Sequence, residues 1–403
     1  MIFEKKNVLL LVPTFADEGG TQKMVYELGR ILAEKYNVFE CSFNAFGEPH
    51  VFKNDSNVIL SLNSPNERSL LSKLKGYPQK IARLKELKKK HKIDVTISNL
   101  WGADLVNALS KGKDKIISIG HSSIVGNPQS RLLLKLRRLG EWVYSRFDKI
   151  IAVNSSLEKE LTDLFNLPRI KVKYINNFIA FPPSGNKDNR TAKELRRLVN
   201  VGRLHEGKNL EPLLIILKKL KKEFVKLQLV LIGNGPMKES LIKKAGELDL
   251  IVSDVLDERN ADLIFTGFVN PFPVLESSDV FVFPSKTEGL PLVLVEAMHT
   301  GLPIISSDCP TGGPHVILEA YTPHDPKRVN AEETKYGYLM PIPESNDLSA
   351  LQVWQETISL LLKNEEKRVK LGHNAKERSL DFSVDKIKHL WFQTIDSLFE
   401  SNR

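Results

Sequence analysis

The stretch "VFVFPSKTEGLPLVLVEAMHTG", residues 280–301, reads as a buried strand followed by a loop and a helix. Its first four residues are all apolar, which is typical of a strand covered on both faces within a parallel sheet. Gly289 and Pro291 suit the entry to a helix, and Gly301 suits its exit. The stretch therefore predicts one strand–helix unit of an open parallel sheet, whose ligands bind beyond the carboxyl ends of the strands.

Strand–helix units of this kind recur along the chain. Apolar runs such as "VLLLVP", "DVTISN", "RLVNVGRL" and "LQLVLIGNG" alternate with segments whose apolar residues recur every three or four positions. This alternation predicts an α/β protein, and 403 residues are enough for two domains. Residues 176–190, "NNFIAFPPSGNKDNR", break the periodicity near mid-chain. We therefore predict doubly wound domains over residues 1–178 and 179–383, and then an amphipathic helix, 384–402, that could pack on either.

The composition is that of a soluble globular protein, with 41% hydrophobic and 27% charged residues. No apolar run is long enough to cross a bilayer, and the first strand is not followed by the cleavage site of a signal peptide. Because Cys41 and Cys309 suggest neither a disulfide framework nor a metal site, we expect a reduced, cytoplasmic location. The net charge of +9 favours a negatively charged partner: nucleic acid, an anionic membrane surface or a phosphorylated substrate.

Two glutamates make the quoted stretch a candidate binding site. Glu288 lies in the loop beyond the strand, and Glu296 lies roughly two turns further on, inside the helix. We expect the N–H groups of Gly289 and Leu290, at the helix start, to bind an anion. A carboxylate beside that anion can accept hydrogen bonds from the hydroxyls of a sugar whose phosphate is bound there. The alternative is a solvated loop residue and an exposed helix position.

A second candidate segment, "NVGRLHEGKNL" at residues 200–210, carries two cations. A strand delivers Arg203 at its carboxyl end, and Lys208 follows at a probable helix start. Gly202 and Gly207 allow the backbone to come close, so the two cations suit a diphosphate. A surface arginine and lysine beside a turn are the alternative.

Three more loops follow strands. Gly233 and Gly235 permit a tight bend next to a bound ring or phosphate, although "LIGNGPMKESL" is weak as a dinucleotide motif. Gly19 and Gly20 open a helix after the first strand and expose N–H groups to a phosphate, unless they form a plain turn. His121 in "SIGHSS" is either a site residue or structural. Two sheets facing each other with all these loops at one cleft would grip a nucleotide diphosphate-sugar.

On these motifs the sequence resembles family 4 of the retaining glycosyltransferases. Proteins of that family have the GT-B fold, in which two Rossmann-like domains face each other across a cleft, and the resemblance covers essentially the whole chain. Glu288 and Glu296 match the family's pair of glutamates eight positions apart, and Arg203 and Lys208 match its diphosphate-binding cations. The double glycine after the first strand and His121 match its N-terminal active-site loops.

The resemblance implies a role for each matching residue. Arg203 and Lys208 would neutralise the leaving diphosphate, Glu288 would hold the donor sugar, and His121 would bind the sugar near the reacting carbon. Glu296 would hold the ribose. The residues assigned to catalysis are Arg203, Lys208, Glu288 and His121, and those assigned to donor binding are Gly19, Gly20, Gly202, Gly233, Val269, Gly289, Leu290 and Glu296.

The resemblance also implies how the two domains divide the work. Residues 1–178 would bind the acceptor, residues 179–383 would bind the nucleotide-sugar, and the final helix would cross back onto the first domain. Transfer would proceed by front-side displacement, in which the departing phosphate oxygen takes the acceptor's proton. No metal and no cofactor would be needed, in agreement with the absence of a DxD-type motif. The sequence departs from the family pattern at Val316, where many relatives carry a glutamate. Residues 318–341 form a long insert-like segment that could shape the cleft, and no motif in it explains its role.

The segment 131–149 suggests where the positive charge acts. Leu132, Leu136, Leu139 and Val143 would share one helical face, with Trp142 nearby. The basic residues around that face are Arg131, Lys135, Arg137, Arg138 and Arg146. This pattern is typical of a helix lying on an anionic membrane, and the alternative is a core helix with a solvated basic face. No recognised nucleic-acid-binding motif is present, so we expect no nucleic acid partner.

The sequence as a whole favours a retaining glycosyltransferase. It would move a hexose or N-acetylhexosamine from a nucleotide diphosphate-sugar, with UDP expected, to a glycan or lipid-linked acceptor in surface-polysaccharide biosynthesis. It would work in the cytoplasm, on the inner face of the membrane if the basic helix binds lipid. The alternatives are an inactive GT-B scaffold subunit and an enzyme that interconverts nucleotide-sugars. An inactive subunit would have no need of the paired cations.

Overall fold

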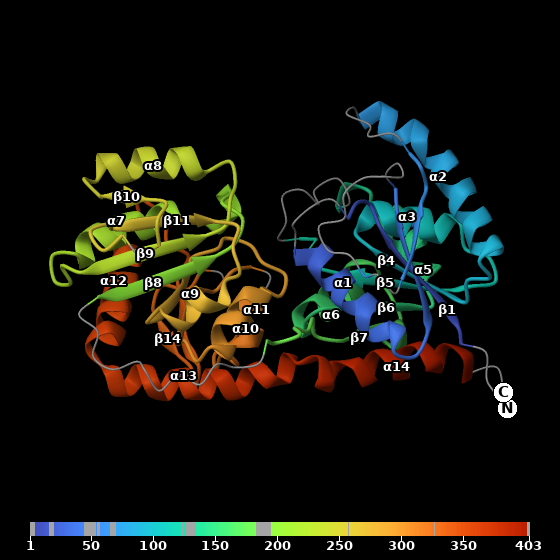
Figure 1. Ribbon diagram of the computed structural model, residues 1–403. Coiled ribbons are helices and arrows are strands. Elements are labelled where there is room, and N and C mark those ends of the chain that lie inside the picture. The colour runs from blue at the N-terminus through green and yellow to red at the C-terminus, as the bar shows by residue number, and fades with distance from the viewer. Residues whose placement is uncertain are drawn as a thin grey trace. The chain divides into compact units, whose positions relative to one another are not determined.

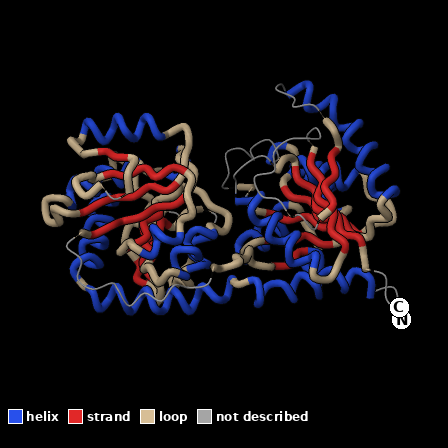
Figure 2. Tube along the Cα trace, in the orientation of Figure 1, coloured by secondary structure: helices blue, strands red, loops and turns tan. Residues whose placement is uncertain are grey.

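The chain forms two compact units, residues 1–180 with 383–403 and residues 181–382, in the computed structural model (Figure 1). The structure describes residues 5–15, 20–43, 54, 57–64, 70–121, 124–125, 134–182, 195–256, 258–310, 312–325 and 327–400. In each unit the strands form a central sheet flanked by helices, as the tube in Figure 2 shows. Apolar strands covered in this way need a hydrophobic face on both sides, which their sequences provide.

The first unit contains a parallel sheet in the order β3-β2-β1-β4-β5-β6-β7. Its strands are β1 (Asn7–Val12), β2 (Asn37–Ser42), β3 (Val58–Ser61), β4 (Val95–Asn99), β5 (Lys115–Gly120), β6 (Lys149–Ala152) and β7 (Val172–Tyr174). Its helices are α1 (Gly20–Ala33), α2 (Leu70–Lys90), α3 (Trp101–Leu109), α5 (Arg137–Ser145), α6 (Ser155–Leu164), η2 (Arg169–Lys171) and α14 (Val384–Glu400). This strand order is that of a doubly wound sheet, and the order reverses between β1 and β4.

The second unit contains the sheet β10-β11-β9-β8-β12-β13-β15-β14, parallel except for the pair β14–β15. Its strands are β8 (Arg196–Val201), β9 (Leu227–Ile232), β10 (Val252–Ser253), β11 (Leu263–Gly267), β12 (Val280–Phe283), β13 (Ile304–Ser307), β14 (Glu332–Glu333) and β15 (Gly337–Met340). Its helices are η3 (Glu206–Lys208), α7 (Glu211–Leu220), α8 (Lys238–Glu247), α9 (Phe272–Glu276), α10 (Leu292–His299), α11 (Gly313–Ile317), α12 (Leu348–Lys363), α13 (Glu365–Ser379) and η4 (Leu380–Phe382). Without the edge strands the order is again that of a doubly wound sheet, and it reverses between β8 and β12. The prediction of two Rossmann-like domains is confirmed.

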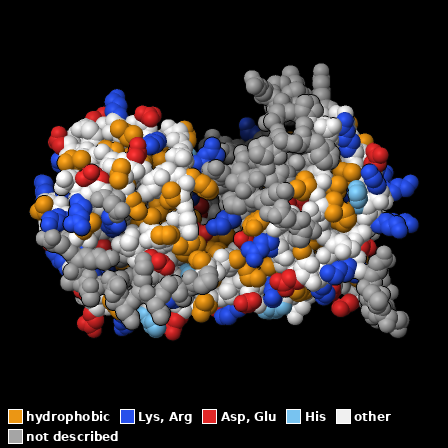
Figure 3. Space-filling model, viewed as in Figure 1, with side chains coloured by type: hydrophobic (Ala, Val, Ile, Leu, Met, Phe, Trp, Pro, Cys, Tyr) orange, Lys and Arg blue, Asp and Glu red, His pale blue; other side chains and the backbone are white. Residues whose placement is uncertain are grey.

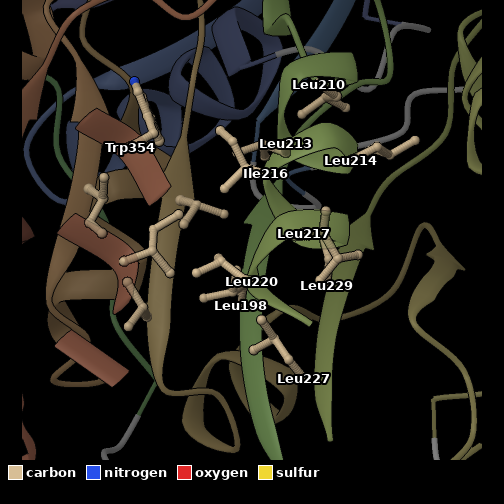
Figure 4. Packing of buried hydrophobic residues seen from close by; sticks show 14 of the residues in the cluster. Leu198, Leu210, Leu213, Leu214, Ile216, Leu217, Leu220, Leu227, Leu229 and Trp354 are labelled. Carbon is tan, nitrogen blue, oxygen red and sulfur yellow. The ribbon is translucent and has the colours of Figure 1, made fainter. Parts of the chain in front are cut away.

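A hydrophobic core of the second unit lies between the sheet and helices α7 and α12. Leucines and isoleucines of α7 pack toward Leu198 of β8 and Leu229 of β9, and Trp354 of α12 approaches them from the neighbouring helix (Figure 4). Trp354 is fully buried, and its indole Nε1–H donates to the carbonyl of Pro341 at 2.8 Å. Because its polar atom has a partner, this large side chain contributes its full apolar burial to stability.

The segment 318–341, which the sequence left without an interpretation, contributes the strands β14 and β15 to the second sheet. Asp308, just after β13, is 1% exposed and accepts hydrogen bonds from His324 (2.6 Å) and from Arg328 (3.1 Å). The hydrogen bond from His324 to this carboxylate raises the pKa of His324. These contacts hold the chain beside β13 and lead it into the antiparallel pair β14–β15. The pair β14–β15 therefore forms one edge of the second sheet.

The last helix, α14, belongs to the first unit, where it packs against α1. The hydroxyl of Tyr36 donates to Asp396 at 3.0 Å, and Lys388 forms an ion pair with Glu34 at 3.1 Å. Trp391 and Ile395 of the same helix are buried. The first unit is thus built from two segments that are far apart in the sequence.

Asp104 in the first turn of α3 should make the stability of the first unit depend on pH. Its carboxylate is 2% exposed and accepts a hydrogen bond from Ser98 Oγ at 2.6 Å, and burial raises its pKa from 3.8 to about 7. The folded state therefore keeps a proton that the unfolded chain releases, so the contribution to stability falls as the pH rises toward and through 7.

We expect Asp104→Asn to remove this loss. Between pH 5 and pH 8 the native protein should lose about 3 kcal/mol of unfolding free energy that the variant keeps. Denaturant titrations of both proteins at the two pH values measure the difference, in which the contributions of all other groups cancel. Equal pH dependence of the two proteins would show that Asp104 is ionised in the folded state.

Candidate active site

The candidate site of the second unit lies where its strand order reverses. Strands β8 and β12 are parallel neighbours, and the loops after their carboxyl ends carry Arg203 and Lys208 on one side and Glu288 on the other. The two loops meet, because Lys208 Nζ lies 2.5 Å from Glu288 Oε1. Both side chains are largely buried, at 13% and 14% exposure. A reversal point of this kind is where open α/β sheets bind their ligands.

The sequence suggested that Lys208 lies at a helix start. In the structure it ends the short helix η3, and the next helix, α7, begins at Glu211. Asn209 follows in the left-handed conformation, with φ 51°, which asparagine tolerates better than most residues. Its side-chain amide donates to the carbonyls of Pro284 (3.2 Å) and Pro343 (2.6 Å). Asn209 therefore fixes the turn that carries Lys208 to the loop after β12, a role that sequence reasoning missed.

The two candidate diphosphate cations differ in their surroundings. Lys208 is paired with Glu288, and its ammonium lies 4.8 Å from the centre of the Phe283 ring. Arg203 is exposed, and its guanidinium has no hydrogen-bond or ion-pair partner within the described ranges. An entering anion can therefore pair with Arg203 directly. To pair with Lys208, it must displace Glu288 or share the ammonium with it.

The glycines of these loops serve contacts between loops. A Cβ on Gly233, whose φ is +133°, would lie 2.2 Å from the carbonyl oxygen of Gly202. The backbone N–H of Gly233 also donates to the carbonyl of Gly267 at 2.8 Å, and a Cβ on Gly202 would crowd Lys208. The close approach expected of Gly233 is thus made to the neighbouring loop. Side chains at these positions would push apart the loops that follow β8, β9 and β11.

The loop between β12 and α10 differs in detail from the expectation. Helix α10 begins at Leu292, so Gly289 and Leu290 precede the helix and do not form its first turn. The carbonyl of Gly289 packs against the first residue of α11, where a Cβ on Gly313 would lie 2.1 Å from it. The N–H groups that open the helix belong to Leu292 and Val293. A helix start is still present two positions after Leu290.

Two further donor-site candidates lie in the same unit. Glu296 is in the middle of α10 and only 3% exposed, so the alternative of an exposed helix position is wrong. Val269 follows β11 and is 42% exposed, next to Phe268 at 59%. Exposed apolar side chains just beyond a strand's carboxyl end suit contact with a flat ring.

The site candidates of the first unit also lie at strand ends. His121 follows β5, and its Nε2 is 2.8 Å from Oδ1 of Asn99, the last residue of β4. Burial lowers the pKa of His121 to about 4, so its ring is neutral near pH 7. Gly20 is exposed and starts α1, whereas Gly19 lies outside the described residues.

The basic segment differs from its predicted amphipathic pattern. Helix α5 buries Gly140, Val143 and Tyr144. The ring of Phe165 packs closely on Gly140, where a Cβ would lie 2.3 Å from it. The predicted apolar face is therefore wrong in part: Val143 is buried, but Leu136 and Leu139 are 44% and 38% exposed. Arg131 and Leu132 lie outside the described residues.

The exposed side of α5 combines apolar and basic side chains. Trp142 is 46% exposed, with the guanidinium of Arg146 lying 5.3 Å from its ring. The exposed basic residues here are Lys135, Arg137, Arg138 and Arg146, and Arg137 pairs with Glu141 at 3.1 Å. We call Leu136, Leu139, Trp142 and these four basic residues the α5 patch. Elsewhere, on the face in Figure 3, basic and acidic side chains are interspersed over the second unit.

No helix in the described part of the chain is long and apolar enough to span a membrane. Nor do the described residues contain a group of three or more His, Cys, Asp or Glu side chains placed to hold a metal ion.

Comparison with known proteins identifies two matching families. Residues 18–180 match the family described as "Glycosyltransferase Family 4", and residues 185–378 match "Glycosyl transferases group 1". The two matches follow each other along the chain and meet near the border of the two compact units.

Individual relatives extend over nearly the whole chain. The amylovoran biosynthesis glycosyltransferase AmsD of Erwinia amylovora is 26% identical over 389 residues, which is 95% of this chain and 98% of that protein. An α-1,4-N-acetyl-D-galactosaminyltransferase of Campylobacter jejuni, whose name includes a glycan on diphosphate-undecaprenol, is 25% identical over 94% of this chain and 95% of that protein. The structure of Anabaena HepE in complex with UDP and glucose matches with a TM-score of 0.73 and 16% identity, covering 97% and 100% of the two chains. That structural likeness shows the fold.

Proposed function

The chain belongs to glycosyltransferase family 4 and has the GT-B fold, and we propose that it transfers a hexose or N-acetylhexosamine from a UDP-sugar, with retention, to a lipid-linked or glycan acceptor. The product would be part of a cell-surface polysaccharide. The observation that carries this proposal is the ion pair of Lys208 and Glu288 at the reversal point of the second sheet, with Arg203 exposed on the same loop as Lys208.

The ion pair supplies a cation for the diphosphate and a hydrogen-bond acceptor for the sugar of a nucleotide diphosphate-sugar. When the diphosphate enters, Lys208 and Arg203 offer it two charge-assisted contacts, each contributing about 1.5–3 kcal/mol. Glu288, which lies 2.5 Å from Lys208, would then lie next to the sugar attached to that diphosphate. Its carboxylate oxygens can accept hydrogen bonds only, and sugar hydroxyls donate them. Glu296, a residue of α10, would accept in the same way from the ribose.

The proposed mechanism places the catalytic effect on the leaving group. Negative charge develops on the diphosphate as the bond to the sugar breaks, and fixed cations at that point lower the barrier. The departing phosphate oxygen takes the acceptor's proton on the same face, which preserves the configuration. Positioning of the acceptor supplies the rest. No protein base, metal or cofactor takes part in this proposal.

The relatives support the substrate classes without identifying them. The HepE structure contains UDP and glucose, and the name of the Campylobacter enzyme includes a glycan on diphosphate-undecaprenol. AmsD takes its name from the biosynthesis of amylovoran. We therefore propose a UDP-sugar donor and an acceptor carried on a lipid diphosphate.

Ligand-observed NMR with UDP-, GDP- and ADP-sugars tests the proposed function. We expect binding of UDP-sugars by the native protein and its loss in Arg203→Ala. Arg259→Ala, which removes another exposed arginine of the same unit, is the matched control and should bind as the native protein does. Absence of binding across the panel would contradict the transferase and favour a scaffold role. Release of a free sugar or an epimer in a donor-only incubation would indicate an interconverting enzyme.

We also propose that the α5 patch rests on an anionic lipid surface, at the membrane where a lipid-linked acceptor resides. The patch offers four exposed cations against one acidic residue, Glu141, and the apolar side chains of Leu136, Leu139 and Trp142 lie among them. Anionic headgroups attract each nearby basic residue by about 1 kcal/mol, and exposed apolar side chains add contact with the acyl boundary.

Reversing two of these charges should release the protein from the lipid. Replacing Arg137 and Arg138 by glutamate should weaken binding to vesicles that contain phosphatidylserine by about 30-fold or more, because the attraction of at least two basic residues is lost. The same charge change at exposed lysines of the other unit, Lys222→Glu with Lys243→Glu, is the control. Co-sedimentation measures both. Equal binding of the two double variants would remove the α5 patch from the proposal.

A further inference from the structure

A histidine of the second unit holds the loop that follows β13 through both of its ring nitrogens. His324 lies in the segment 318–341, for which the sequence offered no interpretation. Its Nδ1 lies 2.6 Å from Oδ1 of Asp308, and its Nε2 lies 3.0 Å from the carbonyl oxygen of Pro310. The Asp308 side chain is 1% exposed. The ring therefore ties this segment to the start of the loop at the carboxyl end of β13.

Both contacts require the ring to donate a hydrogen bond. A carbonyl oxygen can only accept, so Nε2 must carry a proton. The carboxylate of Asp308 also accepts throughout: its Oδ2 receives the guanidinium of Arg328 and the backbone N–H of Asp325, at 3.1 Å each. Burial alone would raise the pKa of this carboxyl, but the hydrogen bonds from His324 and Asp325 outweigh burial and lower the pKa. With a proton on each nitrogen, the ring of His324 is an imidazolium.

The titratable and charged groups around the ring come from three parts of the second unit. Asp308 follows β13, Arg328 lies in the same segment as His324, and the ring of His315 in α11 lies edge-on at 5.8 Å. Arg328 is itself paired with Glu332 at 2.9 Å. The hydrogen bond to Asp308 raises the pKa of His324, and burial and the charge of Arg328 offset this only in part. The imidazolium thus persists to a higher pH than in the unfolded chain.

The loop after β13 supports the neighbouring loop that carries Glu288. Ser307, the last residue of β13, donates from its hydroxyl to the carbonyl of Ser285 at 2.5 Å. At the other end of the loop, a Cβ on Gly313 would lie 2.1 Å from the carbonyl oxygen of Gly289. The helices α10 and α11 that follow the two loops are in contact, and both are labelled in Figure 1. Because Ser285 and Gly289 lie on either side of Glu288, a shift of the loop after β13 would displace that carboxylate.

We propose that His324 is a positioning residue for the donor site: as an imidazolium it fixes the loop after β13 and, through that loop, the carboxylate of Glu288. The inference rests on the proposed function, in which Glu288 and Lys208 bind the donor. When the ring loses a proton as the pH rises, Nδ1 keeps its bond to the carboxylate, and Nε2 has no proton to donate to the carbonyl of Pro310. The loop is then held on one side only. The affinity for a nucleotide-sugar should fall as His324 is deprotonated.

The charge of His324 can be measured in the full chain without any ligand. Two-bond proton–nitrogen correlation spectra of protein labelled with ¹⁵N-histidine show which ring nitrogens carry a proton. The chain has nine histidines, so His324→Gln identifies the signals of interest by their loss. We expect two protons on the ring at pH 6, and a pKa above that of histidine in the denatured protein. A ring with a single proton at pH 6 would overturn the proposal.

Titration with UDP-glucose, or with the UDP-sugar that the panel selects, tests the positioning role between pH 6 and pH 8.5. The diphosphate of a UDP-sugar does not titrate in this range. The dissociation constant should rise by about fivefold or more, with its midpoint at the pKa measured for His324. Because coupling is reciprocal, the bound nucleotide-sugar should raise that pKa by the corresponding amount.

Two variants separate the charge of the ring from its packing. His324→Gln should bind the nucleotide-sugar at pH 6 as weakly as the native protein does at pH 8.5, and it should lose this component of the pH dependence. His373→Gln, which removes an exposed histidine of the same unit, should keep the native pH profile. A structural role alone would weaken binding in His324→Gln equally at every pH.

Arg328→Gln should move the pH profile in a defined direction. The guanidinium lowers the pKa of His324 through its charge, so its removal should shift both the pKa and the loss of affinity to higher pH. Lys327→Gln removes the same charge from the neighbouring exposed residue and should shift neither. A change in the pKa of His324 that leaves the affinity profile in place would contradict the positioning role.

The titration also separates this proposal from the proposed function. If the nucleotide-sugar binds equally well across the pH range, or if the native protein and His324→Gln lose affinity in parallel, the positioning role is wrong while the transferase stands. If no nucleotide-sugar binds at any pH, the proposed function fails. The positioning of its donor then fails with it, even where the ring carries two protons.

Discussion

Replacing Arg203 by alanine should lower kcat/KM for sugar transfer by about 100-fold or more and leave the unfolding midpoint unchanged. Arg203 is exposed and its guanidinium has no partner among the residues that the structure describes, so removal of the side chain costs the fold little. In the proposed site it contacts the leaving diphosphate, where one lost donor typically costs about 2.7–4 kcal/mol of transition-state stabilisation. Steady-state kinetics with the donor found by the nucleotide-sugar panel measures the loss.

Two comparisons make the result specific to the site. Arg259→Ala should keep full activity, and Arg203→Lys, which retains the charge but not the two-pronged geometry, should fall between the native protein and Arg203→Ala. Lys208→Ala should differ from Arg203→Ala because it also leaves Glu288 without its 2.5 Å ion-pair partner, so that stability falls together with activity. Full activity of Arg203→Ala would remove the diphosphate assignment.

A second large effect is expected in the core of the first unit. Replacing Lys88 by methionine should destabilise the protein by about 3–5 kcal/mol, the usual cost of breaking a buried ion pair from one side. The Lys88 side chain is 5% exposed and that of Asp114 2%, and the two charged groups lie 2.9 Å apart. Without the ammonium, the carboxylate keeps the Thr96 hydroxyl and the Gly112 N–H as its partners among the described residues. Denaturant unfolding of the variant measures the cost.

The double variant Lys88→Met with Asp114→Asn shows whether charge is the cause. It removes both charges, so it should recover part of the lost stability, because no uncompensated charge stays buried. Lys85→Met, an exposed lysine on the same helix, should change the unfolding free energy by less than about 0.5 kcal/mol. If Lys88→Met costs no more than Lys85→Met, the pair contributes nothing to the fold.

Local patterns were sufficient to predict the fold class. Continuous apolar runs such as "VFVF" at 280–283 predict buried parallel strands. Apolar residues at every third or fourth position between such runs predict the helices that connect the strands. Strand order was not visible in these patterns. Short strands were also not predicted: β15 has only four residues and lies inside the segment 318–341, for which the sequence analysis offered no interpretation. The contacts of Asp308 with His324 and Arg328, which hold the chain beside β13, form only in the folded chain.

The candidate site was accessible where its residues follow strands directly. Arg203, Glu288 and His121 were predicted as candidates because parallel strands of one sheet bring their carboxyl ends to one edge. Asn209 and Asn99 were missed because they act through hydrogen bonds to residues more than 20 positions away, and no local pattern records such partners. The buried face of α5 was misjudged for a similar reason. Gly140 allows Phe165 to come close, a contact that a hydrophobic periodicity does not register.

The return of α14 to the first unit has a consequence for synthesis on the ribosome. The second unit is one continuous stretch, residues 181–382, and can complete its core as soon as that stretch has emerged. The first unit, although translated earlier, must wait for Trp391 and Ile395 to cover its surface. Domains generally fold in the order of their translation. Here the half made first is the half finished last, and until then the nascent chain presents an apolar surface to chaperones.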